Sequence, residues 1–289
     1  MCKSMPELPE VETIRRQLAK LIVGKKIKKV KVKLPKIVKA PQAVFRRALM
    51  GARIKNVSRR AKLLVFGLDN GWSMLVHLKM TGQLIFQIIK NIEQSTMKNR
   101  YTQKNRYTHV IFNFTDGSRL LFNDLRQFGY IKLVKTVELS NFFLKEGFGP
   151  EPLERDFTLA DLKVLLVRKP KARIKQFLMD PKNIAGIGNI YSDEILFFSR
   201  IHPLRRVASL KPAEIKKIYS GIKKILPAAI KLKGTSTNDY LDVFGRPGKF
   251  AARLKVYGQE GKKCVKCKGR VVRIKIGGRS AHFCPVCQR

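Results

Sequence analysis

Four of the five cysteines in this chain lie within its last 26 residues, as two Cys-x2-Cys pairs separated by sixteen residues. This spacing is typical of four thiolates that bind one tetrahedral zinc ion, with each pair forming one knuckle. A segment this short has little core of its own and needs a metal or another cross-link to fold. The sequence therefore predicts one structural Zn2+ whose ligands are Cys264, Cys267, Cys284 and Cys287.

The residues between the two cysteine pairs have the pattern of a β-hairpin. Residues 271–276 and 280–283 form its predicted strands, and Gly277-Gly278-Arg279 forms its tip. An arginine beside two glycines can approach a phosphate closely. A solvated charge at a turn is the alternative for Arg279, and the local sequence alone favours that alternative.

Hydrophobic periodicity divides the rest of the chain into two halves. Apolar residues at three- and four-residue spacing predict an amphipathic helix from Pro9 to Val23, with Gly24 after its end. The pattern then changes to short alternating segments bounded by turn residues. Six strands are predicted there, at residues 62–68, 72–78, 82–89, 109–114, 118–123 and 130–134. The first half is therefore expected to be an antiparallel β-sandwich or barrel.

The second half has a helical period. Helices are predicted near residues 159–167, 174–179, 190–198 and 212–230, which would form a compact helical domain. The stretch from Lys90 to Arg106 is polar, basic and without a pattern, so a surface loop is expected there.

The charge balance indicates a polyanionic partner. The chain has 61 Lys+Arg against 20 Asp+Glu, a formal charge of +41. Positive charge spread over the whole sequence attracts nucleic acid, with a binding strength that falls as salt rises. Genomic bias is an alternative source of part of the lysine excess. No apolar run reaches the roughly 20 residues that span a bilayer, and the start lacks a signal peptide. We therefore expect an intracellular protein that does not enter membranes.

The segment from Met5 to Glu10 holds a candidate nucleophile. Removal of Met5 would make Pro6 the amino terminus, whose secondary amine would have a pKa near 8 and could form a Schiff base. If residues 1–5 stay attached, the Pro6 nitrogen is an amide and is not nucleophilic. We expect Met5 to be the true initiator, or residues 1–5 to be otherwise absent from the mature protein.

A second candidate site lies before the helix predicted at 190–198. The run from Gly186 to Tyr191 places two glycines and Asn189 at a helix N-terminus, where free N–H groups favour a phosphate. A simple turn is the alternative. Lys171 and Lys175 lie nearby in a run of positive charge, for which a solvated face is the alternative.

These segments together resemble the bacterial formamidopyrimidine-DNA glycosylases of the Fpg/Nei family. The resemblance extends in order from Met5 to Gln288 and rests on six segments: residues 5–13, 59–62, 77–82, 124–129, 186–191 and the cysteine module. It implies an α+β multidomain protein with an N-terminal helix, an antiparallel β-sandwich, a helical helix-two-turns-helix domain and a β-hairpin zinc finger. The corresponding expected ranges are a catalytic domain at 6–136, a linker at 137–153, a DNA-binding domain at 154–254 and the zinc finger at 255–289.

The resemblance also implies a mechanism. The family excises oxidised purines, notably 8-oxoguanine and formamidopyrimidines, from damaged double-stranded DNA and then cleaves the strand by β,δ-elimination. By similarity, Pro6 attacks the anomeric carbon and Glu7 handles the proton on the opening sugar ring. Lys62 matches a general acid or base, and Arg279 matches the residue assigned to the later elimination and to phosphate contact.

Other positions match the family's DNA contacts. Met80, Arg126 and Phe128 match side chains that fill the gap left by the flipped nucleotide; without the resemblance, Met80 and Phe128 are expected in the core and Arg126 on the surface. The expected phosphate contacts are Lys171, Lys175 and Asn189, and Tyr107 is at the position of a further DNA contact. Two of these depart from the family pattern, because Tyr107 replaces a common histidine and Pro170 precedes Lys171.

Three alternatives remain at this level. An endonuclease VIII-like glycosylase would act on oxidised pyrimidines, although residues 8–12 resemble the purine branch more closely. A DNA-binding protein without activity would result if Pro6 stayed capped. A general RNA-binding protein is supported by charge alone. The resemblance further implies a monomer in the bacterial cytoplasm, associated with the nucleoid.

Overall fold

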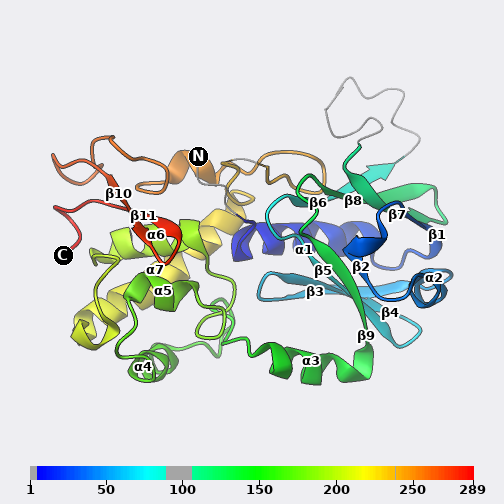
Figure 1. Cartoon of the computed structure of the whole chain (residues 1–289), viewed down its shortest axis with the longest axis horizontal. Coiled ribbons are helices and arrows are strands. Elements are labelled where there is room, and N and C mark those ends of the chain that lie inside the picture. Colours follow the sequence, from blue (N-terminus) through cyan, green and yellow to red (C-terminus); the bar gives the residue numbers. More distant parts are fainter. Residues whose placement is uncertain (1–4, 89–105, 238) are drawn as a thin grey trace. The chain divides into compact units, whose positions relative to one another are not determined.

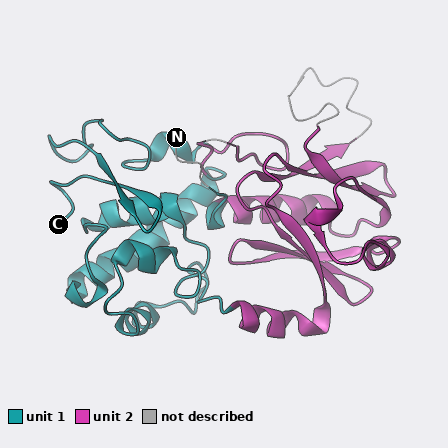
Figure 2. Ribbon diagram, in the orientation of Figure 1, with its two compact units in different colours: residues 1–9, 147–234, 249–289 teal, residues 10–146, 235–248 magenta. Residues whose placement is uncertain are grey.

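The structure is a computed structural model that describes residues 5–88, 106–237 and 239–289. The chain divides into two compact units (Figure 2). Unit 1 contains Met1–Pro9, Gly147–Gly234 and Lys249–Arg289, and unit 2 contains Glu10–Glu146 and Thr235–Gly248. Of the loop expected at 90–106, only Arg106 falls within the described residues.

The described residues of unit 2 form two sheets and three α-helices (Figure 1). The helices are α1 (Leu8–Ile22), α2 (Gln42–Leu49) and α3 (Leu139–Glu146), and the strands are β1 (Ile27–Val32), β2 (Val38–Lys39), β3 (Ile54–Arg60), β4 (Leu63–Leu68), β5 (Trp72–His77), β6 (Gly82–Ile88), β7 (Thr108–Phe114), β8 (Ser118–Asp124) and β9 (Tyr130–Lys135). One sheet has the order β1-β7-β8-β6 and the other β2-β9-β5-β4-β3. Neighbouring strands are antiparallel, except for the short parallel pair β2 and β9.

The two sheets share one hydrophobic core. Phe66 comes from the five-stranded sheet and Phe112 from the four-stranded sheet, and both belong to a single cluster of buried side chains. The apolar stripe of α1 belongs to the same cluster, with Ile14 and Leu18 fully buried. The expected helix and β-sandwich are therefore confirmed, and their sandwich form follows from burial of both inner faces.

A later segment of the chain returns to this unit and packs on α1. Glu10 Oε1 accepts the backbone N–H of Thr235 at 2.7 Å. Gln17 Nε2 donates to Asp242 Oδ2 at 2.9 Å. Residues 235–248 are thereby held on the same unit as the N-terminal helix, although more than 200 residues separate them in sequence.

Helix α3 lies in the interval that the sequence predicted to be a linker. Its Leu139 and Phe142 pack against Leu63, Val65 and neighbouring side chains on the outer face of the five-stranded sheet. Strand β4 is consequently covered on both faces, which explains why it reads as a continuous apolar run.

Unit 1 contains the remaining helices and a hairpin. Its elements are α4 (Leu159–Val167), α5 (Ile174–Met179), α6 (Asn189–Ser199), α7 (Pro212–Lys231), β10 (Val272–Ile276) and β11 (Arg279–Phe283), with short 3-10 turns at Val207–Ser209 and Phe250–Arg253. The four predicted helices and the predicted hairpin are all present. Helix α6 is buried on nearly every side, with Tyr191 fully enclosed. Within the part of the chain that is described, no helix has the length and apolar character needed to cross a bilayer.

Candidate active site

Glu7 is anchored at the N-terminus of α6. Its carboxylate accepts the backbone N–H groups of Gly188 at 2.7 Å, Ile190 at 2.8 Å and Tyr191 at 3.4 Å. The positive end of the helix dipole favours a negative charge at this point. Pro6 precedes Glu7 directly and is buried, so the candidate nucleophile sits next to an anchored carboxylate.

Two glycines make this arrangement possible. A Cβ atom on Gly188 would lie 2.4 Å from Cδ of Glu7, and one on Gly186 would lie 2.7 Å from Cβ of Leu8. Gly186 also has φ +84, a conformation that glycine adopts readily. The glycines of the predicted motif are therefore needed so that the N-terminal segment can approach α6 closely.

This geometry corrects the expected phosphate site at the α6 N-terminus. The N–H groups that were expected to bind a phosphate already donate to the Glu7 carboxylate. The negative group that the helix dipole favours at this point is the carboxylate of Glu7, which belongs to the protein itself. Oδ1 of Asn189 is buried and has no hydrogen-bond partner among the described residues.

Lys62 lies on a tight turn between β3 and β4. Arg60 pairs with Leu63, so the turn consists of Ala61 and Lys62, with Ala61 at φ 52. His77, at the end of β5, pairs with Leu63 in the neighbouring strand β4. Burial, followed by the positive charges of Lys79 and Lys62, lowers the pKa of His77 to about 3. His77 therefore stays neutral at physiological pH, and its Nδ1 accepts the Lys79 N–H at 3.0 Å.

Met80, Arg126 and Phe128 lie together. The Arg126 guanidinium is 4.8 Å from the centroid of the Phe128 ring, and its Nη1 is 2.8 Å from the Met80 sulfur. Phe128 is 54% exposed, which rules out the core position expected for it without the resemblance. The structure thus brings together the three residues that match the gap-filling side chains of the family.

The buried carboxylate of Asp124 shapes the loop that carries Arg126 and Phe128. It accepts a short hydrogen bond from the Thr81 hydroxyl, the N–H of Arg126 at 3.2 Å and the N–H of Gly129 at 2.7 Å. Sequence reasoning assigned Asp124 no role, although its place between an apolar strand and a glycine five residues later was an available signal.

The backbone is strained next to several of the candidate functional residues. Of the described residues other than glycine, Ala61, Lys79 and Gln127 are among the few with positive φ, at 52, 51 and 58. Each directly precedes or follows one of the candidate functional residues. Such conformations cost about 1–3 kcal/mol and persist only where the surrounding structure imposes them.

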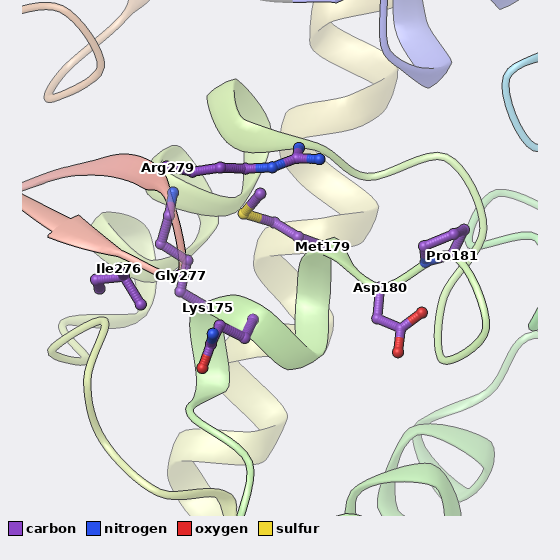
Figure 3. A pocket seen from close by; sticks show the side chains of 8 residues that line it. Lys175, Met179, Asp180, Pro181, Ile276, Gly277 and Arg279 are labelled. Atoms are coloured by element: carbon purple, nitrogen blue, oxygen red, sulfur yellow. The ribbon is translucent and has the colours of Figure 1, made fainter.

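Arg279 opens strand β11, directly after the Gly277-Gly278 turn of the hairpin. It lines a cavity of about 260 Å3 together with Met179, Asp180 and other residues of α5 and its C-terminal end. Figure 3 shows the Arg279 side chain extending from the hairpin across this cavity. The arginine is exposed, as a phosphate contact requires.

The three remaining basic and aromatic candidates differ in exposure. Lys171 is exposed and Tyr107 is half-buried beneath the Arg106 guanidinium, which lies 4.8 Å from its ring centroid. Lys175 is only 1% exposed, and its Nζ lies 2.5 Å from Asp193 Oδ1. This placement corrects the expectation of a direct phosphate contact by Lys175, because its ammonium group is already paired inside the protein.

The four predicted metal ligands converge. The Sγ atoms of Cys264 and Cys287 are 3.8 Å apart, those of Cys267 and Cys284 are 3.5 Å apart, and all four lie within 4.8 Å of one another. A tetrahedron with Zn–S bonds of about 2.3 Å has S···S edges of about 3.8 Å. Burial and the three neighbouring thiols raise the pKa of Cys287 to about 12. Four thiolates can therefore coexist here only with a cation, and the site fits one structural zinc ion.

We expect Asp124→Asn to lower the free energy of unfolding by about 1–3 kcal/mol, because an amide NH2 would face either the Gly129 N–H or the Thr81 hydroxyl. Urea denaturation measures this effect. Asp69→Asn is the control, since Asp69 is exposed and accepts one backbone N–H, from Arg53 at 2.9 Å, that asparagine can also accept. Equal destabilisation by both variants would contradict the role given to Asp124.

His77 should make the protein less stable in acid. The unfolded chain takes up a proton near pH 6.5, whereas the folded protein resists it down to about pH 3, so stability should fall as the pH falls through this window. His77→Gln keeps a hydrogen-bond acceptor and removes the titration. Its free energy of unfolding should therefore depend less on pH between pH 7 and pH 5, and parallel pH profiles for the two proteins would be inconsistent with a neutral His77.

Known proteins are similar to this chain over nearly its whole length. Three family sequence models match: the formamidopyrimidine-DNA glycosylase N-terminal domain at residues 5–131, its H2TH domain at 148–240, and a zinc finger found in FPG and IleRS at 261–289. The formamidopyrimidine-DNA glycosylase of Heliobacterium modesticaldum is 43% identical over 99% of this chain and 100% of its own, and that of Pelotomaculum thermopropionicum is 42% identical over 99% of each.

Solved structures of the Lactococcus lactis enzyme share the fold. Its complex with DNA containing an abasic site has a TM-score of 0.88 and 35% identity, covering 98% of this chain and 99% of that one. A complex of a variant of the same enzyme with DNA containing Fapy-dG matches equally well. The chain therefore belongs to the formamidopyrimidine-DNA glycosylase family.

Proposed function

We propose that this protein excises oxidised purines, 8-oxoguanine and formamidopyrimidines, from damaged duplex DNA and then cleaves the strand as an AP lyase. The observation that carries the proposal is the placement of Pro6 beside a carboxylate anchored by three N–H groups of α6. Relatives that match over the full length, including one solved with DNA containing Fapy-dG, support this substrate class.

In the proposed mechanism, the Pro6 amine attacks the anomeric carbon of the damaged nucleotide, and the base leaves with the electrons of the glycosidic bond. The amine loses its proton, and the sugar ring then opens to give a cationic iminium ion (a Schiff base of the secondary amine), whose positive charge acidifies the neighbouring C2′ hydrogen. Loss of this proton expels the 3′ phosphate by β-elimination, and a further elimination expels the 5′ phosphate. Glu7 serves the proton transfer at the sugar ring, because its anchored carboxylate adjoins Pro6.

The other residues have supporting roles in this proposal. Lys62 acts as a general acid or base, and Arg279 contacts phosphate and assists the later elimination. Met80, Arg126 and Phe128 fill the gap left by the flipped nucleotide, whose unstacking costs a few kcal/mol. Asn189 and Lys171 remain candidate phosphate contacts, and Tyr107 a candidate DNA contact. The zinc ion on the four cysteines is structural and carries no step of the reaction.

We assign the functional ranges as a catalytic domain at 6–136, a linker at 137–153, a helix-two-turns-helix domain at 154–254 and a zinc finger at 255–289. The family match begins at residue 5, which supports Met5 as the initiator and Pro6 as the mature N-terminus. We further propose that the protein acts in the bacterial cytoplasm, on the nucleoid and as a monomer; the bacterial relatives support the cytoplasmic location.

Activity should require a free Pro6 amine. Protein translated from Met5, from which the initiator is removed, should form a covalent adduct with a duplex containing 8-oxoguanine when borohydride is added. Protein that retains residues 1–5 should form none, because its Pro6 nitrogen is an amide. Intact mass spectrometry confirms the start of each form. Equal adduct formation by both would rule out Pro6 as the nucleophile, and preference for a thymine glycol duplex would favour the pyrimidine-specific relatives.

Removal of zinc should abolish DNA binding without changing the sandwich. A chelator that strips the metal releases the base of the β10 and β11 hairpin, since this module has little apolar core. Fluorescence anisotropy with a labelled abasic duplex should show lost affinity that returns when one equivalent of Zn2+ is added. Unchanged affinity of the metal-free protein would contradict the structural role of zinc.

A further inference from the structure

A single buried carboxylate joins α5, α6 and β11 in unit 1. Asp193 Oδ2 accepts the backbone N–H of His282 at 2.9 Å and lies 3.2 Å from Nδ1 of the same residue. Its Oδ1 lies 2.5 Å from Lys175 Nζ, and both of these side chains are 1% exposed. Lys175 Nζ also donates to Ser192 Oγ at 3.2 Å. We call these contacts of Asp193, Lys175 and His282 the Asp193 network.

The Asp193 network acts on the strand that carries Arg279. A two-stranded hairpin is marginally stable by itself, so its orientation depends on what holds it. Zinc fixes the hairpin only at its base, where Cys284 follows His282 by two residues. Arg279 lies three residues before His282, a distance of about 10 Å along a strand. A small rotation of β11 at His282 therefore moves the Arg279 side chain.

Helix α5 also supports the tip of the hairpin. A Cβ atom on Gly277 would come within 2.6 Å of the Gln176 amide nitrogen, so Gln176 lies against the turn. Lys175, Gln176, Gly277 and Arg279 all line the cavity that Figure 3 shows. Since Lys175 and Gln176 are consecutive, the ion pair with Asp193 fixes α5 as a support for both ends of the hairpin.

We propose that Asp193 is a positioning residue that holds β11 by the main chain and ring of His282, and thereby places Arg279 for the elimination steps. This inference rests on the proposed function for its catalytic part only. The hydrogen bonds to His282 give the strand a fixed register on α6, which apolar packing alone would not do.

Two double variants separate positioning from charge. Lys175→Met with Asp193→Asn removes both buried charges, yet asparagine still accepts the His282 N–H. Lys175→Met with Asp193→Leu also removes both charges but leaves no acceptor for that N–H. Both double variants lack the lysine, so its loss affects them equally. A difference between the two therefore measures the effect of the hydrogen bond to the His282 N–H. Asp193→Asn alone leaves Lys175 buried without its counter-charge and should be the least stable of the set.

The test uses zinc-loaded full-length protein with a free Pro6, at saturating enzyme over an abasic duplex. We expect the leucine double variant to reduce the ratio of δ- to β-elimination product by about tenfold, since small misplacements of a catalytic group have effects of this order or larger. Borohydride trapping on Pro6 should fall much less. The asparagine double variant should retain most of the wild-type product ratio.

Hydrogen–deuterium exchange supplies a readout that does not depend on activity. Amides of residues 279–283 should exchange faster in the leucine double variant than in the asparagine double variant, at equal zinc content. Asp161→Asn is the control, because Asp161 belongs to an exposed N-terminal cap on α4 in the same unit and should leave both readouts unchanged.

Identical exchange and identical product ratios for the two double variants would overturn the inference. Absence of trapping and cleavage by the wild-type protein would instead overturn the proposed function, with the exchange result still testing the anchor.

Discussion

The candidate site depends on the hydrogen bonds between the Glu7 carboxylate and the first N–H groups of α6. These bonds fix the chain directly after Pro6, and they need glycines at 186 and 188 to let two backbone segments meet. The first N–H groups of a helix have no acceptor within the helix, and burial of the other faces of α6 in unit 1 holds this end in place. One electrostatic contact thus links the packing of the helical core to the position of Pro6, the candidate nucleophile.

Much of this structure could be predicted from the sequence, and the failures have physical reasons. Helix α1 and strands β4 to β9 were predicted because their apolar periods are clear. Strand β3 was missed because it is an edge strand with mostly polar exposed residues. Helix α3 was missed because its partners are side chains on the outer face of a sheet, and no local pattern reports them.

The organising carboxylates were equally hidden from sequence reasoning. Asp124 contacts Thr81 across 43 positions and Asp193 contacts His282 across 89. Asp124 opens a segment that carries the family resemblance, but nothing in that segment indicates its contact with Thr81. Asp193 has no local motif, since its contact with His282 is set by the fold. In contrast, the spacing of the four cysteines indicates zinc binding directly, and all four ligands could be predicted. The same distinction explains Lys175, whose local context indicated an exposed positive charge but whose partner in space is Asp193.

Buried carboxylates also change how the charge of the molecule is distributed. The chain has 20 acidic residues, and seven of those in the described part are buried: Glu7, Glu10, Glu12, Asp124, Asp193, Glu194 and Asp242. Several accept backbone N–H groups, as Glu194 does from residues 255–257. About a third of the acidic side chains are thus used inside the fold, which reduces the number of negative groups on the surface that meets a polyanion.

The exposed ring of Phe128 has an energetic consequence of its own. The Phe128 side chain is 54% exposed. Complete burial of such a ring is worth about 1.5–3 kcal/mol, so burial of the part that is still exposed is worth roughly half of that. The contact with the Arg126 guanidinium restrains the ring while the ring is exposed to solvent. Insertion of the ring into a base stack would therefore offset part of the free-energy cost of opening the stack, without first having to order the side chain.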